Sequence, residues 1–148
     1  MGDLPGSVLF ACTMNAVRSP MAEAIFKHLH GKRVYVDSVG LKMAPVDPLA
    51  IEVMQEIGID IQRHHSKTFD DLADSSFDVI ITLAPEAQHH AVEMTRVMAC
   101  DVEYWPTFDP TAVEGSREAR LAAYRAVRDE LLRRIRERFP LPAPAEKS

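Results

Sequence analysis

The fold follows from one stretch near the N-terminus, Ser7-Val-Leu-Phe-Ala-Cys-Thr-Met-Asn-Ala-Val-Arg-Ser-Pro20. Its first five residues form an apolar run that is typical of a buried strand. Residues 12–18 have no apolar periodicity and predict a loop. Ser19 and Pro20 then predict the start of a helix, because serine is a good N-cap and proline suits the first helical turn. The stretch therefore predicts a strand, a loop and a helix in immediate succession.

The rest of the chain continues this alternation of strands and helices. Apolar residues at helical spacing follow Pro20, and Gly31 ends that helix. We expect further strands over 33–37, 77–83 and 101–105, helices over 47–57, 85–98 and 116–139, and a short helical turn at 68–71. Such an alternation implies an α/β fold, a parallel sheet with helices on both faces. Ligands of these folds bind beyond the carboxyl ends of the strands, which directs attention to the loop 12–18.

Length and composition are those of an ordinary globular chain, with 148 residues of which 47% are hydrophobic and 26% charged. We expect a single domain over residues 1–139 and a flexible, proline-rich tail over 140–148. No apolar run approaches the ~20 residues that a membrane span requires, and no signal-peptide pattern begins the chain. The sequence therefore predicts a cytoplasmic protein with no membrane partner.

The charge is negative overall but unevenly distributed. A net charge of −5 argues against a nucleic-acid partner, which a basic protein would favour. The last predicted helix differs, because residues 117–138 carry eight arginines and four acids. Its expected buried stripe consists of Leu121, Tyr124, Val127, Leu131, Leu132 and Ile135. The basic face of this helix is either a solvated surface or a docking site for an acidic partner.

The chain contains only two cysteines, Cys12 and Cys100, which is too few for a disulfide framework. The histidines at 64–65 and 89–90 are sequence neighbours, whose side chains point apart on a helix or strand. A zinc site needs three or four ligands at a set spacing, so we expect no metal and no cofactor. With a disulfide framework and a metal site set aside, thiol chemistry remains as a use for the cysteines.

The loop after the first strand has the features of an anion site. The backbone N–H groups of the loop can converge on one anion beside the positive end of a helix; they belong to Thr13, Met14, Asn15, Ala16 and Val17. A cysteine in such a position ionises readily, so Cys12 is a candidate nucleophile. The planar fork of Arg18 can hold two phosphate oxygens at once. The alternative is a buried structural cysteine with Arg18 as a surface charge.

The stretch Val8-Leu-Phe-Ala-Cys-Thr-Met-Asn-Ala-Val-Arg-Ser-Pro-Met-Ala-Glu-Ala24 resembles the signature of the low-molecular-weight protein tyrosine phosphatase family. The thioredoxin-type arsenate reductases share that signature and fold. The similarity covers nearly the whole chain and includes Asp37-Ser38 with Gly40, Asp47-Pro48, Gly58-Ile59-Asp60-Ile61 with His64, and Phe108-Asp109-Pro110. The last helix is closer to the arsenate reductase branch. The resemblance implies a four-stranded parallel sheet with strand order 2-1-3-4.

The same resemblance implies a role for individual residues. Cys12 would take the phosphoryl group, and Arg18 with the loop N–H groups would stabilise the transition state. Asn15 would hold the strained loop, with His64 bonded to it, and Ser19 would donate to the Cys12 thiolate. Asp109 would protonate the leaving oxygen and then activate water.

Three positions depart from the family pattern. Met14 stands where most phosphatase members have glycine, a change that we interpret as tolerated. Thr111 and Ala112 follow Asp109-Pro110 where phosphatase members have tyrosines, and the loop 41–45 lacks the usual aromatic residue. Phe108 or Trp105 are the residues left to supply an aromatic wall, unless both belong to the core. A less aromatic cleft weakens the case for phosphotyrosine and leaves room for small anions.

The third departure concerns thiols. Thioredoxin-type arsenate reductases need a second cysteine after the Thr-Leu that ends the third strand, and this chain reads Thr82-Leu-Ala-Pro85. Cys100 lies at the start of the fourth strand, at the end of a parallel sheet opposite to the loop, so we expect it to be structural. Val17 replaces the neighbouring loop cysteine of many phosphatase members. The chain should therefore lack their internal redox protection.

The sequence thus predicts a cysteine-dependent phosphomonoester hydrolase. Its expected substrate is a phosphorylated protein or a small aryl phosphate, and its loop should bind phosphate-like or sulfate-like oxyanions. One alternative is an arsenate reductase that uses an external thiol and a thiol-redox partner. The other is a phosphate-binding module without turnover.

Overall fold

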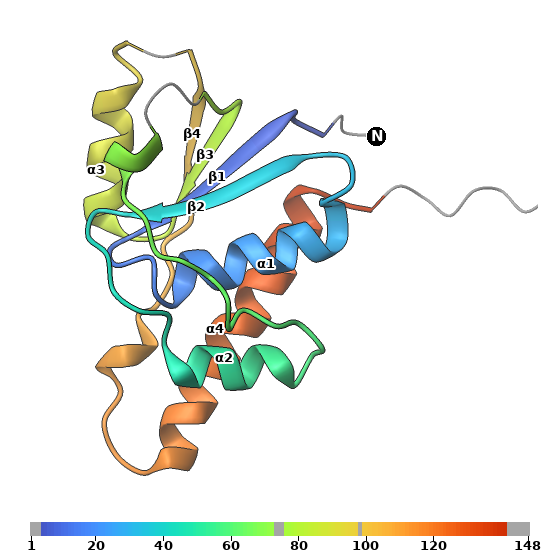
Figure 1. Cartoon of the computed structure of the whole chain (residues 1–148), viewed down its shortest axis with the longest axis vertical. Coiled ribbons are helices and arrows are strands. Elements are labelled where there is room, and N and C mark those ends of the chain that lie inside the picture. Colours follow the sequence, from blue (N-terminus) through green and yellow to red (C-terminus); the bar gives the residue numbers. More distant parts are fainter. Residues whose placement is uncertain (1–3, 73–75, 98, 142–148) are drawn as a thin grey trace, which may run out of the picture.

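A four-stranded parallel sheet with the order β2-β1-β3-β4 forms the centre of the protein (Figure 1). The computed structural model describes residues 4–72, 76–97 and 99–141. The strands are β1 (Ser7–Cys12), β2 (Tyr35–Gly40), β3 (Val79–Thr82) and β4 (Asp101–Tyr104). The helices are α1 (Arg18–His30), α2 (Pro48–Gln55), α3 (Pro85–Met94) and α4 (Arg117–Arg138), with short 3₁₀ turns η1 (Phe69–Leu72) and η2 (Pro110–Ala112). Both the predicted fold class and the predicted strand order are confirmed.

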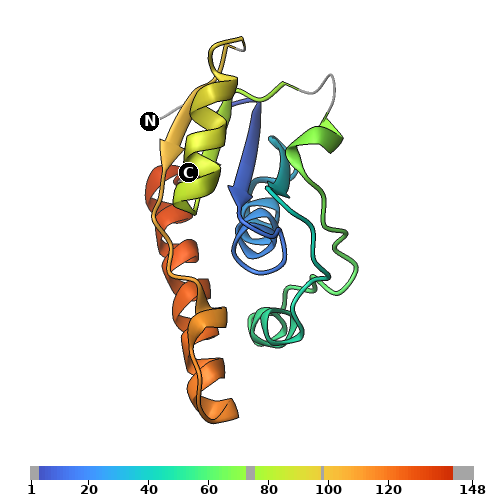
Figure 2. The ribbon, with the colours of Figure 1, turned by 90° about the vertical axis from the view of Figure 1, so that its left-hand side faces the viewer.

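Strand β1 is apolar throughout because both of its faces are covered. Val8, Phe10 and Cys12 face the core shared with α1, α2 and α4, whereas Leu9 and Ala11 face the core beside α3 and η1. This alternation is the period of two that a strand imposes on its side chains. The helices accordingly lie on the two sides of the sheet (Figures 1 and 2).

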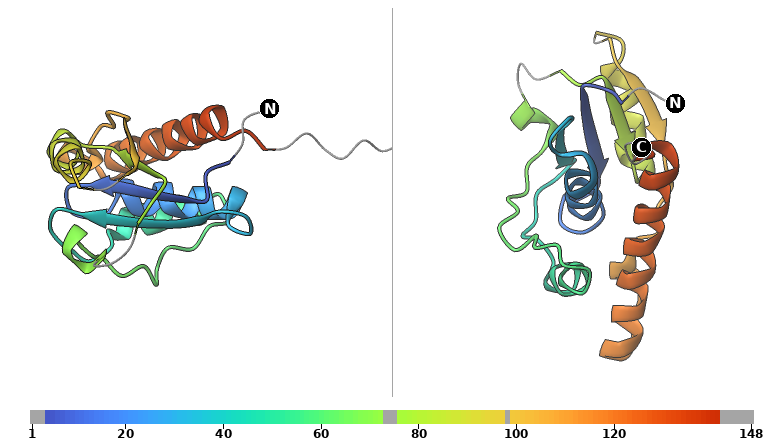
Figure 3. Two further views of the ribbon diagram at one scale, coloured as in Figure 1. Left: turned by 90° about the horizontal axis from the view of Figure 1, so that it is seen from above. Right: turned by 90° about the vertical axis from the view of Figure 1, so that its right-hand side faces the viewer.

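Helix α4 buries the predicted stripe, since Leu121, Tyr124, Val127, Leu131 and Ile135 are at most 3% exposed and Leu132 packs against the same core. Its N-terminal turns extend past the sheet alongside α2 (Figure 3).

Most arginines of α4 pair with acids of the same chain. Arg117 pairs with Glu52, and Arg125 and Arg128 both pair with Glu56, which connects α4 to α2. Hydrogen bonds from Arg125 and Arg128 lower the pKa of Glu56 to about 2. Much of the positive charge of α4 is therefore neutralised within the molecule.

Several predicted boundaries were wrong. Helix α1 begins at Arg18 with Val17 as its N-cap, so Ser19 is not the cap but lies inside the first turn, fully buried. Helix α2 ends at Gln55, because the chain turns through Gly58 at φ +79°, and Ile57 is exposed rather than buried. Helix α3 ends at Met94 rather than near Met98, which lies outside the described residues, as does most of the predicted tail. Strand β2 spans Tyr35–Gly40 instead of 33–37.

Candidate active site

The loop between β1 and α1 lies at the carboxyl edge of the sheet, as predicted. Cys12 is the last residue of β1 and pairs with Gly40 at the end of β2, and Arg18 opens α1. The loop passes so close to Gly40 that a Cβ atom there would lie 2.6 Å from the Asn15 nitrogen and 2.8 Å from the Met14 carbonyl carbon. The absence of a side chain at position 40 therefore lets the loop fold over the end of β2.

We expect Gly40→Ala to displace this loop, because the new methyl group would overlap backbone atoms that no rotamer change can move. The loss of stability should be about 1–3 kcal/mol, the usual range for an overpacked core. Thermal unfolding measures it, and Gly58→Ala, at an open position where only the positive φ is strained, is the comparison. Equal, small effects of both changes would contradict the close approach at Gly40.

Asn15 holds the loop in shape. It adopts a left-handed conformation with φ 53°, which asparagine tolerates better than most residues, and it is fully buried. Its side-chain amide donates to Ser19 Oγ at 2.8 Å and to Ser38 Oγ at 3.0 Å. Its carbonyl oxygen accepts from His64 Nε2 and from the Lys67 backbone N–H, each at 3.0 Å. The structure thus brings Asn15, Ser19 and His64 together.

A second layer of polar side chains lies behind Asn15. Ser38 Oγ donates to Glu23 Oε1 at 2.5 Å, and the same carboxylate oxygen lies 3.8 Å from His64 Nδ1. Burial lowers the pKa of His64, although the negative charge of Glu23 raises it in part. The lowered pKa favours a neutral ring, which donates from Nε2 to Asn15. Lys67 pairs with Asp37 at 2.6 Å. Sequence analysis missed Glu23 and Lys67, because single charged residues on a helix and in a loop carry no distinctive local signal.

Cys12 and Ser19 are in direct contact, with Sγ and Oγ 2.9 Å apart. The Asn15 amide already donates to this hydroxyl oxygen, so the hydroxyl proton remains free to bond elsewhere. It can be donated to Sγ at 2.9 Å or to the Val39 carbonyl at 3.3 Å. This arrangement can stabilise a negative charge on the sulfur.

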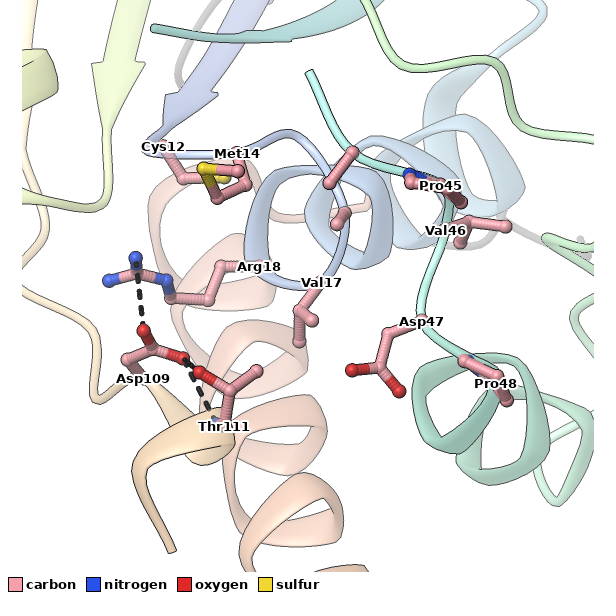
Figure 4. A pocket seen from close by; sticks show the side chains of 12 residues that line it. Cys12, Met14, Val17, Arg18, Pro45, Val46, Asp47, Pro48, Asp109 and Thr111 are labelled. Atoms are coloured by element: carbon pink, nitrogen blue, oxygen red, sulfur yellow. Dashed lines mark hydrogen bonds and ion pairs between the residues drawn. The ribbon is translucent and has the colours of Figure 1, made fainter. Parts of the chain in front are cut away.

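The guanidinium of Arg18 is held by residues of three loops, those that follow β1, β3 and β4. Its Nη1 donates to the Thr107 carbonyl at 3.1 Å and to the Leu83 carbonyl at 3.5 Å, and Nη2 donates to Thr13 Oγ1 at 3.4 Å. Nη2 also lies 3.9 Å from Asp109 Oδ2 (Figure 4). The side chain is 10% exposed, so its orientation is set by the fold.

Asp109 is positioned as the N-cap of η2. Its Oδ1 accepts from the Thr111 N–H at 3.0 Å and from Thr111 Oγ1 at 2.7 Å, which leaves Oδ2 directed at Arg18. The side chain is 48% exposed. Asp109 therefore does two things at once: one carboxylate oxygen caps the turn that the Asp-Pro sequence favours, and the other faces Arg18.

Cys12, Arg18 and Asp109 line a single pocket of about 390 Å³. Its other walls are mostly aliphatic: Met14, Ala16, Val17, Ala44, Pro45, Val46, Asp47, Pro48 and Thr111. Trp105 does not contribute an aromatic wall because it packs against Phe10 and Phe139 in the core. Phe108 is 60% exposed and is not among the lining residues. The pocket that the described residues form is therefore aliphatic and acidic rather than aromatic.

Neither a second thiol nor a metal cluster adjoins this pocket in the described part of the chain. Ala84, at the position where the family resemblance implies a second cysteine in the arsenate reductases, is buried at the start of α3. Cys100 precedes β4, five residues from the row of Cys12 in the strand register and so roughly 16 Å away along the strands. A disulfide needs Cα atoms within ~7 Å. Across residues 4–72, 76–97 and 99–141, no three His, Cys, Asp or Glu side chains are grouped for a metal ion.

The helices in the described ranges include none long and apolar enough for a membrane crossing.

Comparison with known proteins gives consistent results. The family model of the low molecular weight phosphotyrosine protein phosphatases matches residues 7–139. The arsenate reductase of Halalkalibacterium halodurans is 36% identical over 131 residues, which cover 87% of this chain and 91% of that protein. A solved arsenate reductase in the oxidized state has a TM-score of 0.74 at 31% identity and covers 89% of this chain and 95% of its own. The YwlE arginine phosphatase, solved as a mutant with a phosphorylated active site serine, has a TM-score of 0.72 at 25% identity, with 88% and 91% covered.

Proposed function

Because the chain belongs to the low molecular weight phosphotyrosine protein phosphatase family, we propose that it hydrolyses phosphomonoesters through a phosphocysteine intermediate. The observation that carries this proposal is that Cys12, Arg18 and Asp109 line the same pocket. A nucleophile, a fixed cation and an exposed carboxylate are the groups that a two-step displacement at phosphorus requires.

The first step transfers the phosphoryl group to the protein. The Cys12 thiolate attacks phosphorus, the S–P bond forms and the P–O bond to the leaving group breaks. Asp109 gives its proton to the leaving oxygen. Arg18 and the N–H groups of Thr13, Met14, Asn15, Ala16 and Val17 stabilise the equatorial oxygens of the transition state.

The second step releases phosphate. Asp109, now ionised, takes a proton from a water molecule that attacks phosphorus, and the S–P bond breaks. Ser19 stabilises the thiolate as it leaves, a role supported by its 2.9 Å contact with Sγ. Asn15 and His64 act as positioning residues that keep the loop closed around the anion. Two free cysteines fit a reducing compartment, and we place the protein in the cytoplasm.

Arsenate reduction is a second candidate function, which the relatives named arsenate reductase favour. Cys12 would attack arsenic, an S–As bond would form and water would leave. An external thiol would then attack the Cys12 sulfur, and the S–As bond would break with its electron pair left on arsenic. Arsenic would thus be reduced from As(V) to arsenite, and the two sulfurs would be oxidised to a mixed disulfide. The second thiol must come from outside the chain, since Ala84 carries none and Cys100 lies at the other end of the strands.

A paired assay separates these functions. We expect the purified protein to hydrolyse p-nitrophenyl phosphate without added metal, and to reduce arsenate slowly at most with thioredoxin. Glutathione plus glutaredoxin should support whatever arsenate reduction occurs. Rapid thioredoxin-coupled turnover would overturn the assignment of the missing second thiol. Phosphate protection against thermal unfolding without either activity would instead identify a non-catalytic binding module.

A further inference from the structure

A second carboxylate, that of Asp47, shares the pocket with Asp109. The loop after β2 brings this residue to the pocket, and its side chain is directed into it from the side opposite to Asp109, with Val17 between the two (Figure 4). Among the lining residues in the described part of the chain, Arg18 is the one basic side chain. Arg18 is already bonded to two carbonyls and faces Asp109. The pocket thus contains two acidic side chains and one basic side chain, and the basic one, Arg18, already faces Asp109.

Asp47 is held in place from three directions. Its Oδ1 caps α2 by accepting from the Leu49 N–H at 2.8 Å, and its backbone N–H donates to the Ala16 carbonyl in the anion loop. Its Oδ2 accepts at 2.7 Å from the hydroxyl of Tyr124, a buried residue of α4. Burial raises the pKa of Tyr124, and the hydrogen bond to Asp47 and the charge of Asp47 raise it further. The hydroxyl therefore keeps its proton and remains a donor. These bonds fix the carboxylate but leave it acceptor capacity, since two oxygens offer about four lone-pair sites.

None of the lining residues that the structure describes places a positive charge beside the Asp47 carboxylate. The neighbouring acids of α2, Glu52 and Glu56, are neutralised by arginines of α4 outside the pocket. Arg120 is close enough to influence Tyr124, but it is exposed and does not line the pocket. The wall beside Asp47 is aliphatic and consists of Pro45, Val46 and Pro48, so charges in this part of the pocket are screened less than in bulk water.

We propose that Asp47 is a specificity residue that selects phosphomonoesters whose leaving group carries a positive charge. The inference rests on the proposed hydrolase function. Once the phosphoryl group lies over Cys12 and Arg18, the leaving group must extend between Asp109 and Asp47 along the aliphatic wall. Asp109 supplies the proton of the reaction, and Asp47 takes no part in proton transfer and acts through its charge alone. A cation on the leaving group gains an ion pair with Asp47, whereas an anion meets a like charge.

Three esters with the same phenolic ring test this proposal. They are O-phosphotyramine, with an ammonium group, p-tolyl phosphate, which is neutral beyond the phosphate, and 3-(4-phosphonooxyphenyl)propionate, with a carboxylate. We expect kcat/KM to fall in that order, by about three- to tenfold from cation to anion. The ratio between esters is the readout, because it is insensitive to the amount of active protein.

Asp47→Asn is the decisive variant, since asparagine is also a good N-cap and retains the bond from Leu49. It should bring the cation-to-anion ratio to within about twofold of unity, and Glu52→Gln, which removes an acid of α2 outside the pocket, should leave the wild-type ratio. A wild-type ratio near one, or an Asp47→Asn ratio equal to that of the wild type, overturns the proposal and leaves Asp47 as a helix cap.

Failure of the hydrolase function would look different. If the wild type hydrolyses none of the three esters, the proposed function is wrong. The preference is then measured as the affinity of the corresponding cationic and anionic arylmethylphosphonates by titration. Equal affinities would overturn the selection by Asp47 as well, and a cation preference that Asp47→Asn removes would support it.

Discussion

Cys12→Ser should reduce the hydrolysis of p-nitrophenyl phosphate by on the order of 10⁴-fold or more. A serine hydroxyl is not ionised at neutral pH, and no base in the described surroundings of Sγ would activate it, because its partner there is the hydroxyl of Ser19. The change replaces one sulfur atom by oxygen at the end of β1, so we expect the anion loop to stay intact. Stopped assays at high protein concentration measure the residual rate.

The matched control is Cys100→Ser, which removes the other thiol at the opposite end of the strands. It should keep the wild-type rate within about twofold, as expected for a change remote from the site. Phosphate should still raise the Tm of the Cys12→Ser protein, because the loop N–H groups and Arg18 remain. Substantial turnover by Cys12→Ser would exclude the phosphocysteine mechanism.

Asp109→Asn should slow the reaction by an amount that depends on the leaving group. Asparagine can still cap η2 through the bond to Thr111, so the loop should keep its shape. With p-nitrophenyl phosphate, whose leaving group departs without a proton, we expect a loss of about tenfold or less. With phenyl phosphate the loss should approach ~10³-fold, within the range of general acid catalysis.

The comparison of the two esters isolates proton transfer from other effects of the change. Loss of the 3.9 Å approach to Arg18 would affect both esters alike, whereas loss of the acid affects the poorer leaving group more. Asp101→Asn, at the opposite end of β4, is the control and should alter neither rate. Both losses are measured as kcat/KM, which reports the transfer to Cys12 and not the later hydrolysis of the phosphocysteine, a step that is the same for both esters. Equal losses in kcat/KM would exclude Asp109 as the acid.

The sequence predicted the fold because its local signals agree with one another. The apolar run of β1, the proline at the start of α2 and α3, and the apolar stripe of α4 each specify one element and its buried face. Helix ends were less predictable. Serine is a residue type that often caps helices, but the hydroxyl of Ser19 is bonded to Cys12 and Asn15 instead. Contacts with residues of the loop, and not its own helix preference, therefore set the place of Ser19 inside the first turn.

The site was predictable where its residues are close in sequence and hidden where they are not. Residues 12–18 can be recognised as a unit, and Asp109 was singled out through the resemblance of its segment to a family motif. The contacts of Asp47 with Tyr124 and of Glu23 with Ser38 join distant segments, and neither residue type is unusual at its position. The aliphatic pocket agrees with the expectation of a less aromatic cleft, and it answers the question left open for Trp105, which packs in the core.

The separation of Cys12 from Cys100 has a consequence for survival under oxidative stress. Peroxide converts a thiolate to a sulfenic acid, which a neighbouring thiol normally captures before further oxygen is added. Here Val17 and Ala84 stand at the two positions where the family resemblance implies a partner thiol in other members, and Cys100 lies several strand rows away. On the proposed mechanism, an oxidised Cys12 would therefore need a diffusible thiol such as glutathione for its rescue. The working lifetime of such an enzyme would then depend on the size of that pool.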